Sequence, residues 1–174
     1  IREGAMVDYR VYILNAGDPV NIINNIMNTC KKLIVYSSTN NIARALREQL
    51  QSIEEGGPYY IDRIDCNTGE KQRKEMFTKF RESDRAVLLN CKILGEGVDL
   101  PDCDSVFYES GCCSYNTVVQ SMGRCLRLSP NKEIGSIFMM EGAKAEKRLK
   151  EMRQVDPHVD QKLGGIATPI QNVT

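Results

Sequence analysis

LIVYSSTNNIARALREQLQSI, residues 33–53, is the stretch of sequence that decides the fold. It opens with four apolar residues, a length and composition typical of a buried strand. Thr39 or Asn40 can then cap a helix, because a side-chain oxygen accepts a free N–H group of the first turn. We assign the apolar face of that helix to Ile42, Ala45, Leu46, Leu50 and Ile53. A buried strand followed by an amphipathic helix predicts one unit of a parallel α/β sheet.

The same alternation continues on both sides of this stretch. Strands are expected at residues 9–14, 33–36, 59–65, 86–89, 105–108 and 134–140. Helices are expected after Asp18-Pro19, from Thr39 or Asn40, after Thr68-Gly69, from Ser114 to about Leu128, and from Ala143 to Arg153. Runs that are apolar on both faces predict a doubly wound α/β domain, with a parallel sheet flanked by helices.

This alternation also predicts the domain organisation. We expect residues 1–18 to hold a junction and the first strand, and residues 19–153 to complete the α/β domain together with strand 9–14. Residues 154–174 contain Gly164-Gly165 and Pro169 and are expected to be a tail or linker. Because the first residue is Ile1 rather than Met, we expect the chain to be a piece of a longer protein.

Composition excludes several classes of protein. Apolar residues make up 41% and charged residues 26%, which is typical of a globular domain. The net charge is zero, so overall charge does not favour nucleic-acid binding. No apolar run approaches the roughly 20 residues of a membrane span, and no signal peptide is recognisable. We therefore expect no membrane association and an intracellular rather than secreted protein.

Cysteine usage argues against a metal centre. There are seven cysteines but no C-x-x-C pair, and the single histidine, His158, lies near the end of the chain. Structural zinc sites are usually built from closely spaced pairs of ligands. We expect no metal site, and reduced thiols that are mostly buried.

The segment 118–127, VVQSMGRCLR, carries an unusual polar stripe. At helical spacing one side of this segment holds Gln120, Gly123, Arg124 and Arg127, and the other holds Val118, Val119, Met122 and Leu126. A glycine inside a helix costs roughly 1 kcal/mol relative to alanine, so a reason for its presence is needed. Close approach of a phosphate-bearing ligand to the two guanidinium groups is one explanation. A surface helix with two exposed arginines is the other.

Four segments together resemble superfamily 2 helicases. QSMGRCLR at 120–127 resembles their motif VI, ILGEGVDLP at 93–101 their motif V, and LIVYSST at 33–39 their motif IV. Thr68-Gly69, followed by Arg73, Phe77 and Phe80, resembles a further pattern of this family. The segments occur in the family's order, and the style is similar to restriction-type and repair-type DNA translocases and to helicases of large DNA viruses. The resemblance implies the second RecA-like domain of such a motor, located in the cytoplasm, nucleus or viral factory.

The resemblance also implies roles for individual residues. Arg127 would be the arginine finger on the γ-phosphate of ATP, with Arg124 beside it and Gln120 positioning the attacking water or linking to the first domain. Asp99 would lie near the ribose, and Gly95 and Gly97 would let their loop approach the nucleotide. Thr39, Thr68 and Gly69 would donate hydrogen bonds to strand phosphates. Cys91 stands where many relatives have threonine, which puts a nucleic-acid contact there in doubt.

Missing motifs limit what the chain can do alone. The sequence contains no G-x-x-x-x-G-K-S/T phosphate loop and no D-E-x-H/D motif. ATP and Mg²⁺ would therefore be held mainly by a first RecA-like domain, and the chain alone is expected to be inactive. Glu96, where another large branch has arginine, favours DNA over RNA as the partner. The alternatives are a non-catalytic docking module and an unrelated dinucleotide-binding domain, although residues 15–19, NAGDP, lack the G-x-G-x-x-G turn of the latter.

Overall fold

The computed structural model describes residues 8–53, 59–91, 102–109, 115–126 and 134–164. Seven strands form one sheet in the order β3-β4-β2-β5-β6-β1-β7, and every pairing is parallel. The strands are β1 (Asp8–Leu14), β2 (Lys32–Tyr36), β3 (Tyr60–Ile64), β4 (Ala86–Asn90), β5 (Ser105–Tyr108), β6 (Ile134–Met140) and β7 (Leu163–Gly164). The helices are α1 (Pro19–Thr29), α2 (Asn40–Ile53), α3 (Glu70–Glu82), α4 (Tyr115–Leu126), α5 (Ala143–Val155) and the 3-10 helix η1 (Val159–Lys162). The predicted doubly wound α/β class is confirmed.

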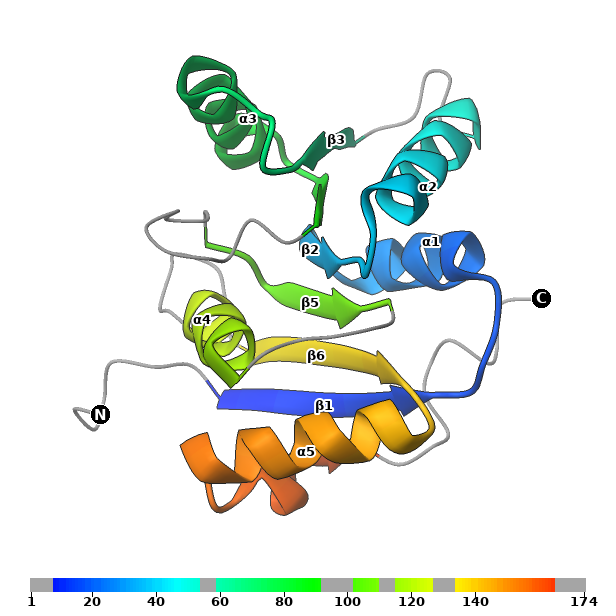
Figure 1. Ribbon diagram of the computed structural model, residues 1–174. Helices are drawn as coiled ribbons and strands as arrows, with labels where there is room; N and C mark the ends of the chain where they lie inside the picture. Colours follow the sequence, from blue (N-terminus) through cyan, green and yellow to red (C-terminus); the bar gives the residue numbers. More distant parts are fainter. Residues whose placement is uncertain (1–7, 54–58, 92–101, 110–114, 127–133, 165–174) are drawn as a thin grey trace.

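Helices cover both faces of this sheet (Figure 1). Apolar side chains of α1 and α2 join the core on one face, which includes Ile23, Ile26 and Leu50. Side chains of α3, α4 and α5 join the core on the other face, which includes Phe80 and Met122. Since the central strands are buried on both sides, their sequences are continuous apolar runs rather than alternating ones.

Local signals set the starts of two helices. Asp18 accepts a hydrogen bond from the backbone N–H of Val20 at 3.3 Å, directly before Pro19 begins α1. Thr39 accepts one from the N–H of Ile42 at 3.2 Å, and the first residue of α2 is Asn40. Both caps agree with the sequence prediction.

The predicted core face of α2 was partly wrong. Ala45 is exposed, whereas Ala43 is fully buried beside Leu46 and Leu50. Positions 43, 46 and 50 follow the helical spacing of three and four residues, so the buried stripe lies two residues away from the alanine we assigned. Because the helix contains two alanines, the sequence alone does not show which of them lies on the buried face.

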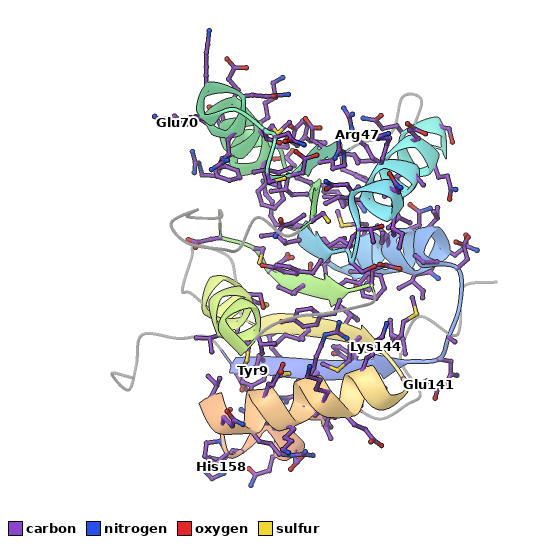
Figure 2. The ribbon with its side chains drawn as sticks, viewed as in Figure 1. Tyr9, Arg47, Glu70, Glu141, Lys144 and His158 are labelled. Carbon is purple, nitrogen blue, oxygen red and sulfur yellow. The ribbon has the colours of Figure 1, made fainter. Side chains whose placement is uncertain are left out.

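The end of the chain contributes to the sheet. The tail predicted from residue 154 is in part structured, because α5 continues to Val155 and η1 and β7 follow it. Val159 is fully buried, and the Tyr9 hydroxyl (Tyr9 is labelled in Figure 2) donates a hydrogen bond to Asp156 at 2.6 Å. Lys162 pairs with Asp8, which lowers the pKa of that carboxyl, and β7 lies against β1. The first and last strands of the described chain, β1 and β7, therefore pair with each other.

Strands β1 and β6 form the longest pairing in the sheet. Their register aligns all seven residues of each strand, from Asp8 with Ile134 to Leu14 with Met140. The rings of Tyr12 and Phe138, aligned in this register, stack with centroids 5.0 Å apart. Over the described ranges, none of the helices has both the length and the apolar character that crossing a membrane requires.

Candidate nucleotide and nucleic-acid interface

Several candidate residues lie at the carboxyl edge of the parallel sheet. Thr39 follows β2 and is exposed, while Thr68 and Gly69 follow β3, two strands away across β4. The carboxyl ends of parallel strands share one edge, where ligands of such sheets bind. The Thr39 hydroxyl accepts the Ile42 N–H, so its own hydrogen is still available for donation outward.

Thr68 has a different environment from Thr39. It is only 9% exposed, its hydroxyl accepts the backbone N–H of Asp65 at 3.0 Å, and it lies 3.4 Å from a carboxylate oxygen of Asp65. The Arg73 guanidinium donates to the Thr68 carbonyl at 3.0 Å. These contacts hold the loop between β3 and α3 in shape. The part of this loop that faces outward is Gly69, which is exposed at the start of α3.

Asp65 is the centre of this loop. Burial raises the pKa of its carboxyl, but hydrogen bonds from the Asn67 N–H, from Arg63 and from Thr68 outweigh burial. The pKa is therefore held below its usual value of 3.8. An ionised Asp65 at neutral pH keeps its bonds to the backbone of Asn67 and to Arg63, and this fixes the entry into α3.

Two buried polar side chains at the same edge escaped the sequence interpretation. Asn90 is the last residue of β4 and is 1% exposed. Ser37 directly follows β2 and is 7% exposed. Within the described residues neither the Asn90 amide group nor the Ser37 hydroxyl has a hydrogen-bond partner. Their backbones are joined, since the Ser37 N–H donates to the Asn90 carbonyl at 2.9 Å. A signal was present, because Asn90 is the one polar residue of an otherwise apolar strand.

Helix α4 packs on the sheet through a mixed face. Its fully buried residues are Val118, Ser121, Met122 and Cys125, at 0–1% exposure. Val118 and Met122 were predicted to lie on this side, but Val119 is only half-buried, and Ser121 and Cys125 belong to the anchoring face instead. Small polar or sulfur-bearing side chains can be buried where hydrogen-bond partners are available to them. The sequence does not show where those partners lie.

The contacts of α4 also give its direction. Ser121 meets Tyr108, the last residue of β5, whereas the Cys125 thiol lies 3.5 Å from the carbonyl of Asp104, just before β5. The helix therefore runs back toward the amino ends of the strands. Position 124 consequently lies nearer to that end, away from Thr39 and Gly69.

Gly123 is the described member of the predicted stripe. It is exposed, opposite the buried face, and an added Cβ would meet no heavy atom of the described residues within 4 Å. Packing within this domain therefore does not require glycine at position 123. Positions 120 and 124 belong to the same helix. Position 120 lies three residues before Gly123, and position 124 directly follows it.

The remaining candidates lie outside what the structure describes. These are Arg127, Gly95, Gly97 and Asp99, together with the side chains of Gln120 and Arg124. Among the described side chains, no group of His, Cys, Asp and Glu residues is arranged to hold a metal ion. Described cysteines are free thiols, of which Cys66 is exposed.

Comparison with known proteins decides the family. Residues 18–129, which contain all four motifs, match the family described as helicase conserved C-terminal domain. The chain belongs to this family. Its sequence is that of the second RecA-like domain of superfamily 2 helicases.

Relatives and solved structures agree with this assignment. The chain is 32% identical over 82 residues to the putative ATP-dependent helicase IRC3 of Saccharomyces cerevisiae, covering 47% of this chain and 12% of the relative. It is 25% identical over 157 residues to a probable helicase of African swine fever virus, covering 80% of this chain and 18% of the relative. The chain thus spans under a fifth of these helicases.

The fold is also shared with a solved ATP-dependent enzyme. The ATP-dependent Type ISP restriction-modification enzyme LlaBIII, solved bound to DNA, superposes with a TM-score of 0.70 at 17% identity, covering 90% of this helicase domain and 14% of that chain. At this identity the likeness concerns the fold. It agrees with the parallel sheet and helical layers of Figure 1.

Proposed function

We propose that this helicase domain is the second motor domain of a longer ATP-dependent nucleic-acid helicase or translocase. In this proposal Arg127 is the arginine finger, Arg124 lies beside it, and Gln120 orients the attacking water or the first domain. Asp99, Gly95 and Gly97 complete the nucleotide contacts. ATP and Mg²⁺ are held mainly by a first RecA-like domain of the longer protein.

The observation that carries this proposal is the orientation of α4. Its buried face is occupied by Val118, Ser121, Met122 and Cys125, so the helix presents its opposite side, with Gly123, outward. An exposed glycine without a packing requirement suits close approach by a partner domain with its nucleotide. Guanidinium groups on the same side would then meet phosphate oxygens.

Nucleic acid is proposed to bind at the carboxyl edge. The Thr39 hydroxyl and the exposed N-terminal end of α3 at Gly69 supply donors for phosphate oxygens. Thr68 is assigned an indirect part, because its hydroxyl holds Asp65 inside the loop. Hydroxyl and backbone donors need no surplus of positive charge, which agrees with the net charge of zero. We favour DNA over RNA, because Glu96 departs from the RNA-helicase pattern.

The proposal is tested by comparing the chain with the full-length protein. We expect ATP turnover, stimulated by a DNA strand, from the full-length protein and none above background from residues 1–174 alone. The chain alone lacks the phosphate loop that would hold the nucleotide. Phosphate release assays with both proteins, with and without single-stranded DNA, measure the difference. Sustained turnover by the chain alone contradicts the proposed division of labour.

A docking module without catalysis is the alternative. It would retain the α/β fold and bind nucleic acid or protein through the carboxyl edge. Such a module has no use for arginines at positions 124 and 127, which the sequence retains. Full-length protein that binds DNA but never hydrolyses ATP would favour this alternative.

Gly123→Ala separates stability from function. In the isolated domain we expect the free energy of unfolding to rise by up to about 1 kcal/mol, because alanine is the better helix former and the added methyl group has free space. In the full-length protein we expect slower ATP turnover, because the same methyl group intrudes between the domains. Urea unfolding of the domain and steady-state turnover of the full-length protein measure the two effects. Unchanged turnover would mean that nothing approaches Gly123 closely.

A further inference from the structure

We propose that Tyr108 is a positioning residue for α4, the helix that directly precedes the proposed arginine finger in the sequence. This inference rests on the proposed function. Tyr108 is fully buried at the carboxyl end of β5, and its hydroxyl is hydrogen-bonded to the Ser121 hydroxyl in the middle of α4. Ser121 is itself fully buried. The contact joins the sheet to the face of α4 opposite Gly123.

The direction of this hydrogen bond follows from its surroundings. Ser121 donates its single hydroxyl hydrogen to the carbonyl of Val118 at 3.0 Å. The Ser121 oxygen therefore acts as the acceptor for Tyr108, whose phenol group is the donor. Both hydroxyls thus have defined partners, and the tyrosine side chain connects β5 to one point on α4.

A second contact holds the tyrosine ring. The guanidinium of Arg148, on α5, lies 5.0 Å from the centre of the Tyr108 ring, and Arg148 is only 3% exposed. A buried guanidinium over an aromatic face is an attractive interaction that is stronger away from water. On the neighbouring strand β2, the centre of the Tyr36 ring lies 5.5 Å from the centre of the Tyr108 ring. The hydroxyl of Tyr108 is therefore presented to α4 from a ring held by both α5 and β2.

Such a contact controls the rotation of α4 about its own axis. The apolar contacts of Val118 and Met122 have no preferred direction, whereas a hydrogen bond weakens as its angle departs from linearity. A rotation of about 10° moves a group about 6 Å from a helix axis by about 1 Å. A misplacement of that size can cost about a hundredfold in rate. Tyr108 would thus act on turnover through the orientation of α4, which contains positions 120 and 124 and directly precedes position 127 in the sequence.

Tyr108→Phe in the full-length protein tests the inference, because it removes only the hydroxyl and keeps the ring with its contacts to Arg148 and Tyr36. We expect kcat for ATP to fall roughly ten- to a hundredfold, with KM unchanged within about twofold. Tyr60→Phe is the matched control. It also removes a tyrosine hydrogen bond, to Asp62 at 2.8 Å, but on the edge strand β3, three strands away from β5. We expect its kcat to equal that of the unmodified protein.

A double-mutant cycle distinguishes positioning from a general loss of structure. If Tyr108 acts through the arginine, Tyr108→Phe should have no further effect on kcat in an Arg127→Ala background. Single-turnover measurements with labelled ATP resolve the low residual rates. Equal fold-losses in both backgrounds would overturn the inference, as would a Tyr108→Phe variant with normal kcat beside a disabled Arg127→Ala variant. Normal turnover by Arg127→Ala would instead overturn the proposed function itself.

Discussion

Arg127→Ala in the full-length protein is expected to reduce ATP turnover about a thousandfold or more. The guanidinium would stabilise the charge that spreads over the oxygens of the transferred phosphoryl group, and this charge develops only during the reaction. The affinity for ATP should change little, because the nucleotide is proposed to be held mainly by the first domain. Steady-state phosphate release measures the first effect, and binding of a fluorescent ATP analogue measures the second.

Arg81→Ala is the matched control for this substitution. Arg81 is exposed on α3, so its loss removes one positive charge without touching α4. We expect its turnover to remain within about twofold of the unmodified protein, since surface substitutions rarely perturb a fold. Turnover that survives Arg127→Ala would show that the finger assignment is wrong. A loss of ATP affinity equal to the loss of turnover would show that Arg127 binds nucleotide and has no special contact in the transition state.

Phe80→Ala is expected to cost about 3–5 kcal/mol of the free energy of unfolding. Phe80 is fully buried where α3 packs on the sheet, and its removal leaves a cavity in the core. The Lys32 ammonium group lies 5.4 Å from the ring and donates to the Phe80 carbonyl, so the cation loses its aromatic neighbour as well. Urea unfolding followed by circular dichroism measures the change.

Thr78→Ala on the same helix provides the comparison. Thr78 is exposed, and its hydroxyl donates a hydrogen bond to the Lys74 carbonyl, one turn earlier in the same helix, at 3.0 Å. We expect a change within about 0.5 kcal/mol. A loss below about 1 kcal/mol for Phe80→Ala would mean that the packing of α3 on the sheet is looser than its burial indicates.

Elements with strong local signals could be predicted from the sequence. The strand at 134–140 has the predicted bounds, and α1 begins at Pro19 after its Asp18 cap. A continuous apolar run needs burial on both faces, and a capping side chain acts within its own first turn. Such information lies within a few residues of the element itself, so the α/β class follows from it.

Features that depend on distant partners could not be predicted. The buried Ser121 hydroxyl is bonded to Tyr108 at the end of β5, and the buried Cys125 thiol donates to the carbonyls of Asp104, just before β5, and of Ser136 on β6. Arg148 is likewise buried with its guanidinium 5.0 Å from the centre of the Tyr108 ring, a contact between α5 and β5. A two-residue strand such as β7 carries no periodicity, because two residues cannot show alternation.

Candidate site residues divide in the same way. The motifs located Thr39 and Gly69 at the carboxyl edge, which follows from strand direction alone. The motifs did not show that the Thr68 hydroxyl is used inside its own loop, because this depends on the position of Asp65 after folding. The sequence marks Asn90 as the polar end of an apolar run, but that pattern is the same whether or not the amide is hydrogen-bonded within the domain.

The pairing of β1 with β6 sets the true limits of this folding unit. The family match stops at residues 18 and 129, so it omits β1, β6 and β7, which all lie on one side of β5 in the sheet order. A protein trimmed to those limits would leave β5 at the margin, with Val106 and Phe107 beside unsatisfied main-chain amides and carbonyls. An exposed apolar strand of that kind recruits strands from other molecules. Aggregation of the trimmed protein would thus be a consequence of where it was cut.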